Sequence, residues 1–237
     1  MVAQERSVSI TVFFPCYNEQ DNVAKVADKA LEVLEGLRAD YEIIIVNDGS
    51  ADDTGRVADR IAADHKRVRV IHHPRNLGYG AALQSGFRAA TKELVFFTDG
   101  DAQFDLAELP PWLPLMKEYD IVCGYRMNRQ DNFVRRLNGW LWTKMTGRLF
   151  ALKLRDIDCA FKLFQRAIFD DLKMESAGAL INTEILARMA RKGYRMTQRG
   201  VHHYPRTAGK QTGCNPKVIV RAFQELLRLR RRILSEP

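Results

Sequence analysis

LVFFTDGDAQ, residues 94–103, places an apolar run directly before two aspartates. The run predicts a buried strand that ends at Asp99. Open α/β sheets bind their ligands at the carboxyl ends of their strands. Two carboxylates there concentrate negative charge beside apolar backbone, and a hard divalent cation bridging to a phosphate is the usual compensation. We therefore expect Asp99, Asp101 and Gln103 to form an oxygen-rich site for Mg²⁺, although such a pair alone is often just a loop or a helix cap.

Upstream of this stretch, strands and helices alternate. The apolar runs predict strands at 7–14, 41–46 and 68–72. Helical spacing or position predicts helices at 22–37, 53–64 and 80–91, one after each strand. This order predicts an α/β fold whose sheet is mainly parallel, with helices on both faces.

The second half of the chain is less regular. Strands are predicted at 120–124, 160–164 and 194–203, with helices at 132–152 and 182–192. Residues 215–237 contain six Lys or Arg and two Glu, and 218–234 has an amphipathic pattern. We expect a catalytic domain over 1–212 and a basic amphipathic helix over 213–237.

Composition limits the class of protein. The 237 residues are 46% hydrophobic and 28% charged, which is an ordinary globular balance. A net charge of +8 favours a polyanionic partner, such as a nucleotide, a nucleic acid or an anionic membrane. The four cysteines are widely spaced and contain no Cys-x-x-Cys pair, so neither a zinc site nor a disulfide framework is expected and a reducing cytosol fits. Neither a signal peptide nor a transmembrane helix is expected.

The first two strands end in residues that suit a nucleoside. Tyr17 could pack on a ribose or base and Glu19 could accept a ribose hydroxyl. The alternative is an ordinary turn in which Glu19 meets a helix dipole. Asp48 could accept a base N–H, with Gly49 allowing close approach of the backbone. The alternative there is a turn whose side chains cap the next helix.

RNLGYGA, residues 75–81, follows the third strand and opens a helix. Backbone N–H groups at that helix start could meet a phosphate. The segment is neither a Walker A loop nor a full Gly-x-Gly-x-x-Gly loop. Close packing of the helix explains its glycines equally well.

These four features fall at four successive strand ends, and together they resemble the family 2 inverting glycosyltransferases of GT-A fold. The narrower resemblance, over residues 8–212, is to the dolichol-phosphate mannosyltransferase, or polyprenyl-phosphate glycosyltransferase, branch. It implies Mg²⁺ or Mn²⁺ at Asp99, Asp101 and Gln103. The residues it implies for the nucleotide sugar are Pro15, Tyr17, Glu19, Val46, Asp48, Asp99, Gly100, Asp101, Gln103, Arg126, Arg206 and Lys210.

The resemblance also implies an acceptor side. Arg126, Arg135 and Arg136 match basic residues that receive the lipid phosphate. DIDCAFK, residues 156–162, matches the acceptor-loop motif, and its leading Asp156 would orient or deprotonate the acceptor. The motif ends in a lysine where the family usually has arginine, which weakens any bidentate contact.

The expected activity is inverting transfer of a hexose, mannose or glucose, from a GDP- or UDP-hexose to a polyprenyl phosphate. Asp101, Arg126 and Asp156 would be catalytic. Because a phosphate acceptor is already an anion, positioning and charge neutralisation would suffice without a strong base. Aromatic and basic residues in 132–152 and 218–234 suit a peripheral contact with the cytoplasmic face of a membrane. The alternative is that both helices pack on the core or form an oligomer interface.

Three rival functions are weighed against this one. A soluble family 2 enzyme with a saccharide or protein acceptor would need a base, for which Glu184 is the second candidate acid; Glu184 could equally be an exposed helix residue. A sugar-1-phosphate nucleotidyltransferase is disfavoured because residues 15–19 are not its glycine-rich basic loop. A nucleic-acid-binding protein is disfavoured because zinc-finger spacing and a known RNA-binding aromatic motif are missing from the sequence.

Overall fold

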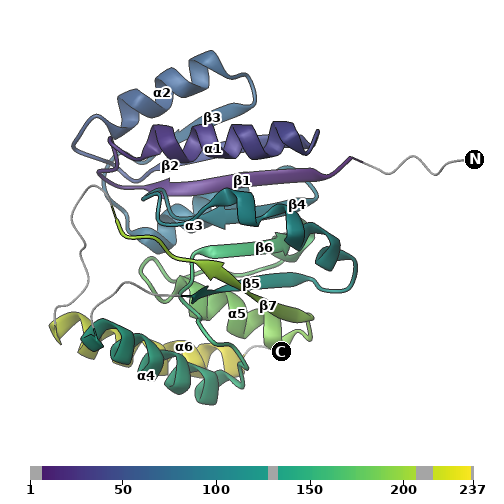
Figure 1. The fold of residues 1–237 in the computed structure, drawn as a ribbon. Coiled ribbons are helices and arrows are strands. Elements are labelled where there is room, and N and C mark those ends of the chain that lie inside the picture. Colours follow the sequence, from purple (N-terminus) through teal and green to yellow (C-terminus); the bar gives the residue numbers. More distant parts are fainter. Residues whose placement is uncertain (1–6, 128–132, 207–215, 236–237) are drawn as a thin grey trace, which may run out of the picture.

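Seven strands form one mixed sheet in the order β3-β2-β1-β4-β6-β5-β7 (Figure 1). The computed structural model describes residues 7–127, 133–206 and 216–235; for residues 133–136 and 216–224 it describes the backbone alone. The strands are β1 (Ser9–Cys16), β2 (Asp40–Asn47), β3 (Val68–His72), β4 (Leu94–Thr98), β5 (Ile121–Met127), β6 (Phe161–Gln165) and β7 (Met196–His202).

The first four strands run parallel, as the alternating pattern predicts. They are connected by α1 (Val23–Gly36), α2 (Thr54–Asp64) and α3 (Tyr79–Ala89). Stacked and edge-on rings join the sheet to its helical cover: Phe13 and Phe97 lie side by side in β1 and β4, and Phe87 of α3 contacts both. This core fixes the carboxyl ends of β1, β2 and β4 along one edge of the sheet, where ligands of α/β proteins bind.

Strand β6 runs antiparallel between β4 and β5. Phe161 starts β6 opposite Thr98, the last residue of β4. The loop that leads into β6 therefore reaches the same edge as Asp99. Strand β7 then pairs with β5 in parallel and ends at that edge as well.

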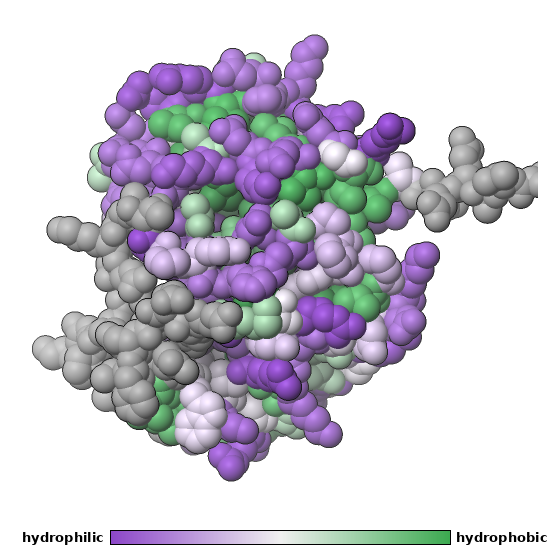
Figure 2. Space-filling model, viewed as in Figure 1, coloured by the Kyte–Doolittle hydropathy of each residue, from purple (hydrophilic) through white to green (hydrophobic). Residues whose placement is uncertain are grey.

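Short 3-10 helices fill part of the second half. They are η1 (Leu106–Glu108), η2 (Pro110–Lys117) and η3 (Arg166–Phe169). Pro114 removes a backbone donor inside η2, which disfavours a regular α-helix there, whereas Pro110 and Pro111 occupy the first two positions, where proline is tolerated. The face in Figure 2 is mostly hydrophilic, with hydrophobic atoms visible in patches.

The remaining helices are α4 (Phe133–Phe150), α5 (Ile181–Arg191) and α6 (Pro216–Ser235). Helices α4 and α6 lie side by side (Figure 1), and Arg230 Nε donates to the Leu149 carbonyl at 3.1 Å. On α6 the side chains of Leu226, Leu229 and Ile233 are buried. In the described part of the chain, every helix is too short or too polar to cross a membrane.

Candidate active site

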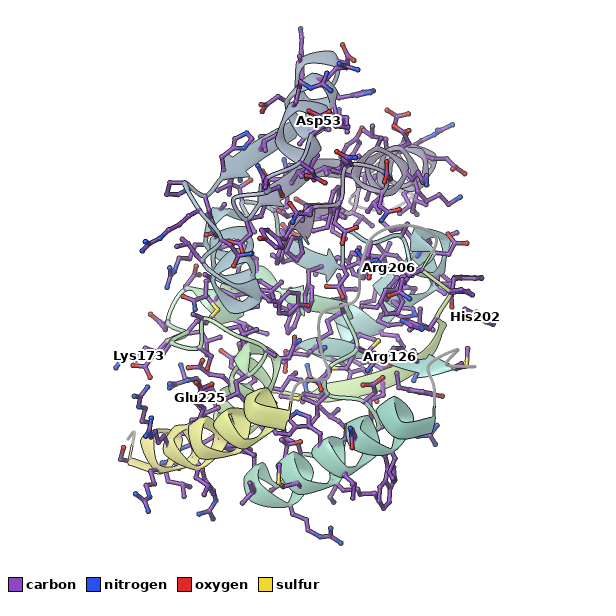
Figure 3. All side chains as sticks on the ribbon, turned by 90° about the vertical axis from the view of Figure 1, so that its left-hand side faces the viewer. Asp53, Arg126, Lys173, His202, Arg206 and Glu225 are labelled. Carbon is purple, nitrogen blue, oxygen red and sulfur yellow. The ribbon has the colours of Figure 1, made fainter. Side chains whose placement is uncertain are left out.

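Figure 3 looks onto the edge where the parallel strands end, with Arg126 and Arg206 labelled on it. Pro15 and Val46 pair in register at the ends of β1 and β2, and both are buried. Tyr17 is exposed beside them. Gly100 packs against this floor, since a Cβ there would lie 2.5 Å from Cys16 Sγ and 2.8 Å from the Pro15 carbonyl oxygen. The turn after β4 therefore requires glycine where residues 99–103 pass the end of β1.

The two aspartates of the quoted stretch lie together at the end of β4. Tyr79 Oη donates to Asp99 Oδ1 at 3.0 Å, and Asp101 Oδ1 accepts from the Gln103 backbone N–H at 3.1 Å. Burial, and then the charge of Asp101, raise the pKa of Asp99 to about 7. Two carboxylates that resist ionising together fit a site in which a bound cation would compensate their negative charge.

No group of three or more His, Cys, Asp or Glu that could hold a metal occurs among the described residues. Carboxylates of the Asp99–Asp101 pair could thus supply only part of a coordination shell. This is how Mg²⁺ is usually held, with one or two carboxylates and the remaining positions taken by water and substrate phosphate.

Arg206 bridges two of the predicted donor-site carboxylates. Its guanidinium forms an ion pair with Glu19 and lies 3.6 Å from Asp101 Oδ2. Glu19 also accepts from Asn22 Nδ2 at 2.7 Å, and burial raises its pKa. The cation predicted to clamp the diphosphate thus lies within the predicted site, against its carboxylates.

The segment that carries Arg206, residues 203–206, is hydrogen-bonded to the loop after β4, residues 99–103. Tyr204 N donates to the Gln103 carbonyl oxygen, and Gln103 Nε2 donates to the Tyr204 carbonyl oxygen, both at 2.9 Å. The side-chain nitrogen of Gln103, a residue predicted to face a cation, therefore holds residues 203–206 in place. At the end of β7, His202 pairs with Glu108 of η1 at 3.2 Å.

Asp48 is held from three directions at the end of β2. Its Oδ1 accepts from His73 Nδ1 at 2.6 Å and from Leu77 N at 2.9 Å, while Oδ2 accepts from Gly78 N at 2.9 Å. The predicted alternative, a cap on α2, is wrong, because Asp48 instead organises the loop between β3 and α3. Gly49 has φ +64°, and a Cβ there would lie 2.1 Å from the Arg75 carbonyl carbon.

On the acceptor side, Arg126 and Asp156 form a bidentate pair. Arg126 Nε and Nη2 donate to the two carboxylate oxygens at 2.7 and 2.8 Å. Burial lowers the pKa of Arg126, but hydrogen bonding and attraction to Asp156 outweigh it and the pKa is raised. Both oxygens of Asp156 are occupied by this pair, so its geometry is that of a residue that orients Arg126.

Glu184 is neither an exposed helix residue nor an available base. It is fully buried and accepts from the backbone N–H groups of Glu175 and Ser176, and it pairs with Arg188 at 3.0 Å. Sequence reasoning missed this role because an acid in the first turn of a helix has no signature that separates burial from exposure.

The start of α3 is also occupied by protein. The carbonyl oxygen of Ala177 accepts from Gly80 N at 2.8 Å and from Ala81 N at 3.2 Å. A Cβ on Gly80 would lie 2.2 Å from the Ser176 carbonyl oxygen. The sequence of residues 75–81 allowed two alternatives, close packing of the helix or phosphate binding. The N–H groups of Gly80 and Ala81 are used in close packing and do not point to a phosphate site.

Lys162 ends the DIDCAFK motif inside the protein. It is 1% exposed; its ammonium donates to the Cys159 carbonyl oxygen and lies 5.4 Å from the centre of the Phe97 ring. It therefore supports the floor of the site and does not reach an acceptor. Of the remaining predicted residues, Lys210 and the side chains of Arg135 and Arg136 lie outside the described part.

The comparisons with known proteins agree with this architecture. The sequence model of the family Glycosyl transferase family 2 matches residues 11–173. The chain is 28% identical over 173 residues to a dodecaprenyl-phosphate galacturonate synthase of Rhizobium johnstonii, covering 71% of this chain and 51% of that protein. It is 31% identical over 173 residues to an undecaprenyl-phosphate 4-deoxy-4-formamido-L-arabinose transferase of Proteus mirabilis, covering 70% and 52%. It thus spans about half the length of these relatives.

A solved structure shows the same fold. Glucosyl-3-phosphoglycerate synthase of Mycobacterium tuberculosis, in complex with Mn²⁺, UDP and phosphoglyceric acid, matches with a TM-score of 0.72 at 17% identity. The match covers 97% of this chain and 80% of that one. The mostly parallel sheet with carboxylates at its strand ends is the GT-A fold, the fold of nucleotide-sugar glycosyltransferases. The chain belongs to glycosyltransferase family 2.

Proposed function

We propose that this protein is a metal-dependent inverting glycosyltransferase that moves a hexose from a UDP- or GDP-hexose to a polyprenyl phosphate. The observation that carries the proposal is the convergence of Glu19, Asp99 and Asp101 with Arg126 and Arg206 on one sheet edge. Support for the lipid acceptor comes from the relatives, two of which are named for transfer to dodecaprenyl or undecaprenyl phosphate.

Asp101, with Asp99 and the side-chain oxygen of Gln103, would hold Mg²⁺ or Mn²⁺. Their oxygens suit a hard cation, and the raised pKa of Asp99 indicates that the pair lacks a full counter-charge. When bound, the ion neutralises negative charge on the leaving nucleoside diphosphate. Arg206 would leave Glu19 and Asp101 for the diphosphate, which frees Glu19 for a ribose hydroxyl. Tyr17 would line the nucleoside.

The acceptor phosphate would bind at Arg126. Asp156 holds Nε and one terminal nitrogen, Nη2, of this guanidinium in one plane, so the remaining N–H groups are presented in a fixed direction. A phosphate oxygen that is already an anion attacks the anomeric carbon from the face opposite the leaving group, so the residues here supply orientation and charge. Arg135 and Arg136 are proposed to add positive charge for the acceptor phosphate, and Lys210 for the donor diphosphate.

The pair α4 and α6 would rest on the cytoplasmic face of a membrane. Trp140 is 56% exposed and Leu141 50% exposed on α4, and Leu234 is 52% exposed on α6. Four arginines are also exposed on α6: Arg228, Arg230, Arg231 and Arg232. Along the lower edge of Figure 2, where α4 lies, hydrophobic and strongly hydrophilic residues alternate. This mixture suits a headgroup region.

The test is transfer of labelled sugar into an organic phase. The purified protein is incubated with Mn²⁺, a panel of UDP- and GDP-hexoses, and undecaprenyl or dolichyl phosphate. We expect lipid-dependent label that Asp101→Asn reduces at least about 100-fold. Asp105→Asn is the matched control, because Asp105 lies in the same loop but its carboxylate caps η1 through Ala107 N. Donor hydrolysis without a lipid product would point to a soluble acceptor.

A further inference from the structure

A buried line of hydrogen bonds runs from α3 to the end of β2. Ser85 Oγ lies 2.9 Å from His73 Nε2, and His73 Nδ1 lies 2.6 Å from Asp48 Oδ1. A carboxylate can only accept, so Nδ1 carries the proton and donates. In neutral His73 the other nitrogen then accepts from the Ser85 hydroxyl. The side chains of His73 and Asp48 are 8% and 4% exposed, so solvent competes little for these bonds.

This line limits what Asp48 can still bind. A carboxylate has about four acceptor directions, two on each oxygen. His73 and Leu77 N use both directions on Oδ1, and Gly78 N uses one on Oδ2. With respect to the described residues, one acceptor direction on Oδ2 is left. The small exposure of the side chain makes that opening narrow.

The bases of the two expected donors differ in what they ask of such a carboxylate. Guanine presents a ring N–H and an amino group side by side, and these pair with a carboxylate through both oxygens at once. Uracil presents a single imide N–H between two carbonyl groups. Because both acceptor directions of Asp48 Oδ1 are already used, Asp48 can accept the single N–H of uracil but cannot accept both N–H groups of guanine.

Side chains suited to a flat base come from the segments bound to Asp48. The backbone N–H of Asp48 donates to the Cys16 carbonyl oxygen at 2.9 Å, and the next residue, Tyr17, is 47% exposed. Leu77, whose N–H holds Oδ1, is 41% exposed. An aromatic and an aliphatic side chain are thus exposed on the two segments whose backbones bind Asp48.

We propose that His73, held by Ser85, is a positioning residue that leaves Asp48 a single acceptor direction, and that the donor site consequently selects a uracil nucleotide over a guanine nucleotide. The inference rests on the proposed function, because it assumes a nucleotide-sugar donor. It deepens that function by naming the base and by assigning a role to His73 and Ser85.

The test is calorimetric binding of UDP and of GDP to the full chain in Mn²⁺. The wild type should bind UDP at least about 10-fold more tightly than GDP, the discrimination expected when a buried polar edge is left unpaired. His73→Ala frees a direction on Oδ1 and lets Asp48 rotate, so the UDP-to-GDP preference should fall several-fold. His73→Asn places an amide N–H where Nδ1–H stood and should restore the preference.

His72→Ala is the matched control, because His72 contacts Asn47 and Asp59 and has no bond to Asp48; its preference should equal that of the wild type. Equal or tighter binding of GDP by the wild type would overturn the inference and leave the glycosyltransferase proposal standing. So would loss of both nucleotides in equal measure in His73→Ala, because a merely structural role has that signature. If neither UDP nor GDP binds the wild type, the proposed function fails and the inference fails with it.

Discussion

Asp99 holds its proton more tightly than an exposed aspartate, since burial and the neighbouring Asp101 raise its pKa to about 7. Between about pH 4 and pH 7 the folded chain binds a proton that the unfolded chain has released. The contribution of Asp99 to stability therefore falls as the pH rises, by at most about 4 kcal/mol. Asp99→Asn mimics the protonated form, so wild type should lose stability relative to this variant as the pH rises from about 4 to about 7. Urea unfolding in EDTA measures the difference.

Asp105→Asn is the control for that experiment, because it removes one carboxylate from the same loop without touching the pair. Its difference from the wild type should stay flat over the same pH range. Parallel curves for wild type and Asp99→Asn would show that Asp99 is ionised throughout and would contradict the prediction.

Arg126 and Asp156 should behave as one unit. Asp156→Asn removes one charge-assisted bond and frees the guanidinium, and Arg126→Lys keeps the charge but loses the planar fork. Each change should slow transfer at saturating acceptor by about 10- to 100-fold. In a double-mutant cycle the combined variant should be little worse than either single one, because both remove the same geometry. Additive losses, or a loss confined to Asp156→Asn, would instead favour an independent acceptor base at Asp156.

At this scale the sequence predicts residue types and positions better than residue partners. Asp99 and Asp101 are found where the apolar run ends, and Arg126 in a Gly-x-Arg segment that lies within the last part of β5. The partners Tyr79, His73 and Lys162 were missed, because each contact joins segments that meet only in the folded sheet. Lys162 shows the difficulty best, since a lysine in an acceptor motif gives no local sign that its ammonium is buried over Phe97.

Helix α5 acts on the site through a loop. Glu184 holds Glu175 and Ser176 by their N–H groups, and the same loop presents the Ala177 carbonyl oxygen to the start of α3. The first residue of α3, Tyr79, binds Asp99. Buried Glu184 therefore positions α3, and α3 in turn supports Asp99 in the loop after β4. This role requires no contact between Glu184 and a substrate.

Glu184→Gln tests this structural role. It replaces the carboxylate that accepts from two backbone N–H groups with an amide. It also removes the charge of one of the carboxylates that pair with Arg188, which is 3% exposed. We expect a loss of about 3 kcal/mol in the free energy of unfolding, with an unchanged transfer rate per folded molecule. Glu32→Gln, which breaks an exposed pair with Lys29, is the control and should leave the free energy of unfolding nearly unchanged. A large fall in rate at unchanged stability would restore Glu184 as a base.

Strand order is the element-scale feature that the sequence did not predict. The pattern indicates a strand at 160–164 but carries no information on its direction. Its apolar residues are buried whichever way it runs, because β6 lies between β4 and β5 and is covered on both faces. The direction follows from where the preceding loop lies, and that depends on Asp156 reaching Arg126 across thirty residues.

On the scale of the whole molecule, two surfaces meet at one end. The strand ends collect carboxylates, Arg126 and Arg206, while α4 and α6 beside them expose apolar and basic side chains (Figures 1 and 3). An enzyme that joins a water-soluble donor to a phosphate on a lipid would benefit from this juxtaposition, because the acceptor phosphate lies at headgroup depth. The net charge of +8 would then serve two anionic partners, the donor diphosphate and the membrane.

Point changes on α4 test the membrane contact more cleanly than removal of α6, since Leu226, Leu229 and Ile233 of α6 are buried in the protein. Trp140→Ser with Leu141→Ser removes two exposed apolar side chains, so binding to vesicles of anionic phospholipid should fall at least about 10-fold at unchanged thermal stability. Leu77→Ser, which removes an exposed leucine far along the chain, should bind like the wild type. Transfer to a short, water-soluble prenyl phosphate should persist in the double variant, because its catalytic residues are intact. Unchanged vesicle binding would mean that α4 faces another protein surface.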